Sequence, residues 1–133
     1  MNGAPIEIQV LAVSVALVLL QIGLQSLTMT AEMGVGYNVS ARDGGARLHG
    51  VYAPRLERAL KNLLETYTVF VALALALAVT GKSGGAGTTG ALVWIVARGV
   101  YLPLYAFGVP VLRTLVWIAS IAGLVMMLTR LVG

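Results

Sequence analysis

Four long apolar stretches constrain this chain more than any other feature. They cover about residues 6–29, 54–80, 91–107 and 111–132. A helix needs about 20 mostly apolar residues to cross a hydrocarbon core of roughly 30 Å. The bilayer core gives backbone groups no water to bond, so such segments form helices. The sequence therefore predicts an all-α integral membrane protein, with residues 1–133 forming a single four-transmembrane-helix bundle.

Composition supports this fold class and excludes several others. Hydrophobic residues make up 59% of the chain and charged residues only 11%, against about 25% charged in a typical soluble domain. The net charge of +4 is not gathered in a basic stripe, so we expect no nucleic-acid partner. The absence of cysteine excludes disulfides and thiolate metal sites, and we expect no bound metal.

The first apolar stretch has a competing interpretation as a signal peptide. A signal peptide has a basic start and a shorter apolar region. This stretch opens with Glu7, has no Lys or Arg before it, and is about 24 residues long. We therefore expect a retained membrane span.

Glycine and polar residues separate the spans. Residues 33–52 form a predicted loop, and residues 81–90, which read GKSGGAGTTG, form a predicted flexible turn. Gly108 and Pro110 indicate a short turn before the fourth span. In that span Ala119 and Gly123 either permit close helix packing or are small residues facing lipid.

Basic residues predict the orientation of the bundle. Four spans place both termini on one side and the first and third connections on the other. The second side holds six basic residues, whereas the side of the termini holds only two, Lys82 and Arg130. The positive-inside rule then places the loop 33–52 in the cytoplasm and both termini outside it.

Several charged side chains lie at bilayer depth, where a charge is costly and usually functional or paired. Arg58, Asn62 and Glu65 share one face of the second span. Glu65 and Arg98 both lie roughly 15 Å from the cytoplasmic ends of their helices, at 1.5 Å per residue. We therefore predict a buried Glu65–Arg98 ion pair, whose role is more often structural than chemical.

A polar stripe continues on the third span. Trp94, Arg98, Tyr101 and Tyr105 follow one another at helical spacing, and Arg113 opens the fourth span on the same side. The tyrosines are either interfacial anchors or part of a site. These cations and hydrogen-bonding groups lie next to apolar helix surface. Such a site suits an anionic polar molecule that is bound beside a lipid-soluble one. The first span has its own polar face, which we expect to bond across helices, formed by Ser14, Gln21, Gln25 and Thr28.

Two separated motifs resemble those of the MAPEG family, the membrane-associated proteins of eicosanoid and glutathione metabolism. The first is the helix-two pattern R-A-x-x-N-x-x-E, matched over residues 58–65. The second is Ala97-Arg98-x-x-Tyr101-x-x-x-Tyr105, followed by Arg113. Arg42-Asp43 in the first loop is similar to a dipeptide of bacterial members. The resemblance covers roughly residues 40–125.

This resemblance implies a homotrimer in a bacterial inner membrane, in contact with membrane lipid. It implies that glutathione, as co-substrate, binds between protomers near the cytoplasmic face. Its contacts would be Arg58, Asn62 and Glu65 from the second helix and Tyr101 and Tyr105 from the third. Arg113 would be the catalytic residue, since a nearby cation lowers the pKa of a thiol from about 8.5. The thiolate would attack a lipophilic small-molecule substrate.

Three function classes follow. The first is a membrane-bound glutathione-dependent transferase or peroxidase acting on lipophilic electrophiles. The second is a non-catalytic lipid-binding or structural membrane protein of the same fold. A channel or transporter is disfavoured, because the two halves show no internal repeat. The sequence does not identify the hydrophobic substrate. It also does not distinguish between conjugation, peroxide reduction and isomerisation as the reaction.

Overall fold

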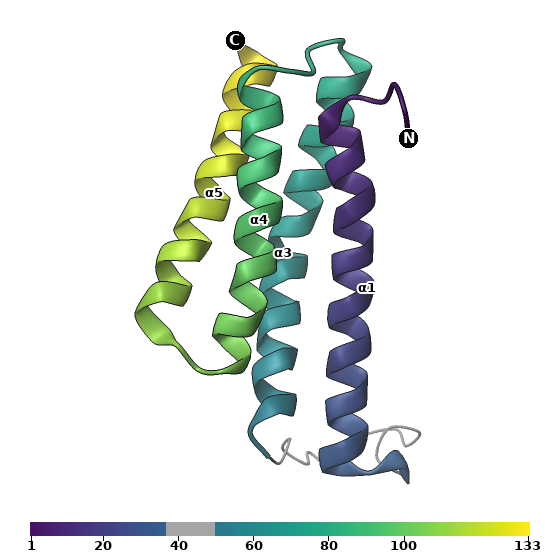
Figure 1. Ribbon diagram of the computed structural model, residues 1–133, viewed down its shortest axis with the longest axis vertical. Coiled ribbons are helices and arrows are strands. Elements are labelled where there is room, and N and C mark those ends of the chain that lie inside the picture. Colours follow the sequence, from purple (N-terminus) through teal and green to yellow (C-terminus); the bar gives the residue numbers. More distant parts are fainter. Residues whose placement is uncertain (37–49) are drawn as a thin grey trace.

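The computed structural model describes residues 1–36 and 50–133 and contains four long helices in that part of the chain (Figure 1). They are α1 (Ile6–Met33), α3 (Tyr52–Val79), α4 (Ala86–Ala106) and α5 (Pro110–Val132). Each is long and apolar enough to cross a membrane. Both termini lie at one end of the bundle and the α4–α5 turn at the other (Figure 1). The predicted class, an all-α membrane protein with four spans, is confirmed.

The helices extend further into the predicted loop 33–52 than the apolar stretches do. α1 ends at Met33, and α3 begins at Tyr52, ahead of Pro54. The middle of this loop, with Arg42-Asp43, lies outside the described residues. Glu32 at the end of α1 accepts hydrogen bonds from the backbone N–H groups of Tyr52 (3.2 Å) and Ala53 (3.0 Å). Its carboxylate thus caps α3, where the helix dipole favours negative charge.

The glycine-rich segment 81–90 is only partly a turn, which corrects the prediction that it is flexible throughout. α4 begins at Ala86, so Gly87 and Gly90 are helical. A side chain at Gly87 would lie 2.8 Å from the Glu7 carboxylate, and one at Gly90 would overlap the backbone of Gly123. Close packing therefore outweighs the poor helix propensity of glycine, which costs about 1 kcal/mol per residue.

A second carboxylate ties α1 to the start of α4. Glu7 is fully buried, and its Oε1 accepts hydrogen bonds from the Gly84 backbone N–H (2.7 Å) and the Thr88 hydroxyl (3.2 Å). Glu7 and Glu32 thus satisfy N-terminal groups of α4 and α3 at opposite ends of α1. α1 is connected to both neighbouring helices by polar contacts as well as by packing.

The larger hydrophobic core cluster lies between α3, α4 and α5, with Val10 of α1, in the half of the bundle nearer the termini. Phe70 and Trp94 stack with ring centroids 3.9 Å apart, and Tyr67 tilts against both rings. The Tyr67 hydroxyl hydrogen-bonds to Ser14 of α1 at 2.9 Å. Ser14 therefore makes the bond across helices that the polar face of the first span predicts.

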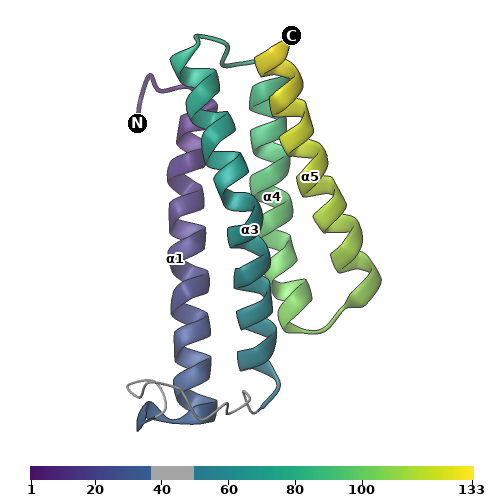
Figure 2. The ribbon, with the colours of Figure 1, turned by 180° about the vertical axis from the view of Figure 1, so that it is seen from behind.

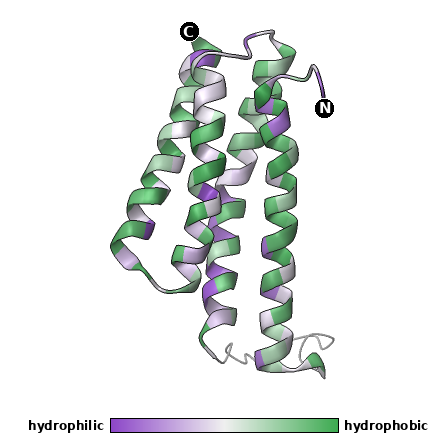
Figure 3. Ribbon diagram, in the orientation of Figure 1, coloured by the Kyte–Doolittle hydropathy of each residue, from purple (hydrophilic) through white to green (hydrophobic). Residues whose placement is uncertain are grey.

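The opposite half of the bundle is more open and more polar. α5 leans away from α3 toward the α4–α5 turn, which both ribbon views show (Figures 1 and 2). In this half, hydrophilic residues occur on α1, α3 and α5 (Figure 3). The widening between α3 and α5 leaves room for the cavity described next.

Candidate functional site

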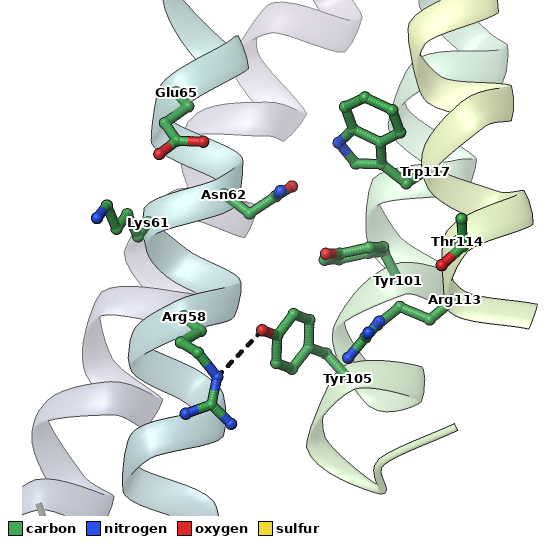
Figure 4. A pocket seen from close by; sticks show the side chains of 9 residues that line it. All are labelled: Arg58, Lys61, Asn62, Glu65, Tyr101, Tyr105, Arg113, Thr114 and Trp117. Atoms are coloured by element: carbon green, nitrogen blue, oxygen red, sulfur yellow. Dashed lines mark hydrogen bonds between the residues drawn. The ribbon is translucent and has the colours of Figure 1, made fainter. Parts of the chain in front are cut away.

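One cavity of about 460 Å³ collects the polar residues of three helices (Figure 4). This volume lies within the range of small-molecule sites, about 300–1,000 Å³. We call it the cationic pocket, and it is lined by Arg58, Lys61, Asn62 and Glu65 from α3, Tyr101 and Tyr105 from α4, and Arg113, Thr114 and Trp117 from α5.

Tyr105 connects the three helices at the mouth of the pocket. Its hydroxyl accepts a hydrogen bond from Arg58 Nε at 3.2 Å. The Arg113 guanidinium carbon lies 4.5 Å from the centre of its ring. Tyr101 meets the same ring edge-on, with centroids 5.6 Å apart. Tyr105 thus positions Arg58 of α3 and Arg113 of α5 at the same cavity.

The stacked position of Arg113 leaves its hydrogen-bonding edges free. A cation over a tyrosine face gains roughly 0.5–2 kcal/mol without using any N–H donor. Within the described residues the Arg113 guanidinium makes no hydrogen bond and no ion pair. Five donors in a planar fork are therefore available to an anion in the pocket.

Arg98 lies behind the pocket, and its partner differs from the predicted one. Its Nη1 donates to Asn62 Oδ1 at 2.9 Å, and its guanidinium carbon lies 4.5 Å from the Tyr101 ring centre. Glu65 is exposed, and the Glu65–Arg98 ion pair is not formed among residues 1–36 and 50–133. Three residues turn a helix through about 300°. Viewed along the axis of α3, the Glu65 side chain therefore points in a direction about 60° from that of Asn62, away from α4.

The pocket carries a net positive charge. Arg58, Lys61 and Arg113 are cations and Glu65 is the single carboxylate in the lining, giving three minus one, or +2. Arg58, Lys61 and Glu65 are exposed in the single chain, whereas Arg113 is half-buried. The arrangement suits a small anion that also carries one positive group for Glu65.

The structure brings together every residue predicted to bind or act: Arg58, Asn62, Glu65, Tyr101, Tyr105 and Arg113 all line the one cavity. Three further residues were missed as site residues: Lys61, Thr114 and Trp117. Trp117 follows Arg113 by one helical turn, so the i, i+4 spacing was a usable signal. Thr114 and Lys61 carry no signal that distinguishes them from ordinary interfacial residues.

Comparison with known proteins supports the motif resemblance. The chain matches no curated protein and no solved structure. The model of the MAPEG family matches residues 10–133, nearly the whole chain. This match includes α3, α4 and α5, α1 from residue 10 onward, and every residue that lines the cationic pocket. The chain belongs to the MAPEG family.

Proposed function

We propose that this protein is a membrane-bound glutathione transferase or peroxidase that uses Arg113 to stabilise the glutathione thiolate. Membership of the family supports a glutathione-related activity of transferase or peroxidase type. The observation that carries the finer proposal is the position of Arg113. Its guanidinium stacks on Tyr105 in a cavity of charge +2 and has no protein acceptor among the described residues.

The charges of the pocket complement those of glutathione, which has two carboxylates, one ammonium group and one thiol. Arg58 and Lys61 suit the carboxylates, and Glu65 suits the ammonium group. Asn62 and Tyr101 offer hydrogen bonds to the peptide groups. Arg113 then faces the thiol, where a cation favours the charged thiolate.

The chemical step needs no further protein group. The glutathione thiol releases its proton to water, and Arg113 stabilises the resulting thiolate. The sulfur then forms a bond to an electrophilic carbon while a leaving group departs with its electron pair. With a hydroperoxide, the sulfur attacks the outer oxygen, the O–O bond breaks, and the departing alkoxide takes a proton from water to give the alcohol. A second glutathione then reacts with the resulting sulfenic acid to give the disulfide and water.

We also propose that the pocket works within a homotrimer in a membrane. Members of the family are generally trimers. Arg58 and Glu65 are exposed in the single chain, and the pocket opens on the protomer surface. A neighbouring protomer would cover this open side and exclude water, which strengthens the contacts between Arg113 and the thiolate.

The decisive experiment compares Arg113→Gln with the wild-type protein in lipid nanodiscs. We expect the ultraviolet thiolate absorbance that glutathione gains on binding to appear at a more alkaline pH in the variant than in the wild-type protein. We expect kcat/KM for an aryl halide electrophile to fall at least about tenfold, which corresponds to one pKa unit of thiol stabilisation. Arg130→Gln makes the same change at the opposite end of α5 and should leave both quantities unchanged.

Two results would contradict the proposal. One is wild-type protein that binds no glutathione by calorimetry at millimolar concentration. The other is an Arg113→Gln variant with unaltered thiolate absorbance and activity. The first result would favour the non-catalytic, lipid-binding alternative.

A further inference from the structure

A second pair of cations lies at the end of the bundle with the termini, away from the cationic pocket. A hollow of about 260 Å³ opens there, which we call the end site, and it is lined by Gly81, Lys82, Thr129, Arg130 and Gly133. Arg130 follows Arg113 by 17 residues on α5, which is roughly 26 Å at 1.5 Å per residue. The end site is therefore separate from the proposed glutathione site.

Backbone carbonyls hold both cations of the end site in place. Lys82 Nζ donates to the Leu131 carbonyl of α5 at 2.7 Å. In the opposite direction, Arg130 Nε of α5 donates to the Lys82 carbonyl at 2.9 Å. These two crossed hydrogen bonds connect the α3–α4 turn to the end of α5. They also fix two positive charges at one hollow.

Neither cation has a carboxylate partner. Within the part of the chain that the structure describes, Lys82 and Arg130 form no ion pair. Glu7 lies at the same end, but it is fully buried and hydrogen-bonded to the start of α4. An ammonium group has three donors and a guanidinium five, and each uses one here. Because Arg130 is exposed and Lys82 half-buried, an anion can reach the remaining donors and reduce the repulsion between the two charges.

An exposed apolar stripe on α5 leads to the end site. Leu115, Ile118 and Val125 are 57%, 52% and 52% exposed. Their spacing places them on the same helical face as Thr129, which lines the end site. From Val125 to Leu115 the stripe is roughly 15 Å long at 1.5 Å per residue, which is half of a hydrocarbon core of roughly 30 Å. The stripe therefore matches the acyl region of one leaflet.

We propose that the end site binds the phosphate of an anionic phospholipid whose acyl chain lies along this stripe of α5. Lys82 and Arg130 donate to the phosphate oxygens, for which a guanidinium has a matching planar geometry. The stripe favours a lipid over free phosphate, because it gives an acyl chain apolar contact next to the two cations. A zwitterionic lipid carries its own cation beside the phosphate, so its attraction to the site is weaker. This inference goes beyond the proposed function and does not depend on glutathione.

The first test titrates the wild-type protein in detergent with phosphatidylglycerol or with phosphatidylcholine of the same acyl chains, and counts bound lipids by native mass spectrometry. We expect one phosphatidylglycerol per protomer to bind saturably. Its affinity should exceed that of phosphatidylcholine by at least about fivefold, the effect of one charge at a membrane surface. Glycerol phosphate at millimolar concentration should not displace it, because this soluble headgroup has no acyl chain for the stripe.

The second test compares Lys82→Gln and Arg130→Gln with Arg55→Gln. Arg55 is the matched control, because it also donates to a carbonyl at the end of a helix, that of Ala106 in α4, at 3.1 Å. All three variants lose such a bond, so a purely structural role would affect them alike. We expect Lys82→Gln and Arg130→Gln each to weaken phosphatidylglycerol binding about fivefold, and Arg55→Gln to stay within about twofold of wild type. Lys82→Arg and Arg130→Lys keep the charge and should keep most of the affinity.

Several outcomes would overturn the proposal. Non-saturating binding, equal affinity for the two lipids, or an equal loss in Arg55→Gln would show ordinary contact with surrounding lipid. Displacement by glycerol phosphate would show a site for free phosphate instead. Absence of bound lipid would show that another occupant, such as a second copy of the chain, covers the stripe. The titration of the wild-type protein decides between these outcomes even if a glutamine variant does not fold.

Discussion

At the residue scale, the most unusual group is the Arg98 guanidinium, buried within the bundle with one hydrogen bond to Asn62. Its Nε and Nη2 have no acceptor among the described residues. Burying a charge is costly unless it is paired and hydrogen-bonded. The single bond to Asn62 and the Tyr101 ring face are therefore the contacts that make this charge tolerable. Because Asn62 and Tyr101 also line the cationic pocket, Arg98 positions two of its walls.

We predict that Asn62→Leu lowers the free energy of unfolding by roughly 1–3 kcal/mol, because Arg98 Nη1 loses its acceptor in a buried position. In an Arg98→Met background the same substitution should cost much less, since the donor is gone. Thermal unfolding of all four proteins in detergent measures this double-mutant cycle. Equal costs in the two backgrounds would show that the Asn62–Arg98 bond contributes nothing.

The residues of the site could be predicted because their spacing is a local property. Arg58, Asn62 and Glu65 share a helical face whatever the helix packs against. The partner of Arg98 could not be predicted in this way. Asn62 and Glu65 both lie at nearly the depth of Arg98 in the neighbouring helix, so depth alone allows either of them as its partner. The rotation of α3 about its own axis turns Asn62 toward Arg98. Trp117 was missed because a tryptophan near a membrane surface has an ordinary interpretation as an anchor.

At the element scale, the start of α4 shows packing overriding local propensity. Gly90 of α4 approaches Gly123 of α5 so closely that a Cβ on Gly123 would lie 2.6 Å from the Gly90 carbonyl oxygen. Small residues permit such approach between membrane helices. Of the predicted pair in the fourth span, Gly123 makes this contact, whereas Ala119 is exposed and lines an outer apolar groove between α4 and α5.

We predict that Gly90→Ala lowers the free energy of unfolding by about 1–3 kcal/mol, because the methyl group has no space against the Gly123 backbone. Gly99→Ala on the same helix is the matched control, since a methyl group there would have no other side chain or helix within 4 Å. It should be neutral or stabilise by up to about 1 kcal/mol through helix propensity. Circular dichroism during heating in detergent tests both. Similar changes for the two variants would refute a specific α4–α5 contact.

At the scale of the whole molecule, polar groups are divided between the two ends. The α4–α5 turn end holds the cationic pocket and Arg55, whose guanidinium donates to the Ala106 carbonyl at 3.1 Å. The end with the termini holds Lys82 and Arg130, which donate to the carbonyls of Leu131 and Lys82. By the positive-inside rule, the excess of basic residues at the turn end predicts that this end faces the cytoplasm.

We predict that Ala86→Cys and Phe107→Cys report opposite sides of the membrane. The chain has no cysteine, so each introduced thiol is the only one. Both positions are exposed, at the start of α4 and beside the α4–α5 turn. In bacterial spheroplasts a membrane-impermeant maleimide should label Ala86→Cys, and should label Phe107→Cys only after permeabilisation. The reverse pattern would invert the topology and place the cationic pocket on the outer side.

The sequence by itself determined four membrane helices, the face shared by Arg58, Asn62 and Glu65, and the side on which the basic residues collect. These follow from hydrophobic length and helical spacing, which are properties of short segments. Only the tertiary structure decided that residues 86–90 are helical, that Arg98 bonds to Asn62, and that Trp117 lines the cationic pocket together with Arg113. These depend on how close two helices approach and how each is rotated, which the packing of distant residues sets.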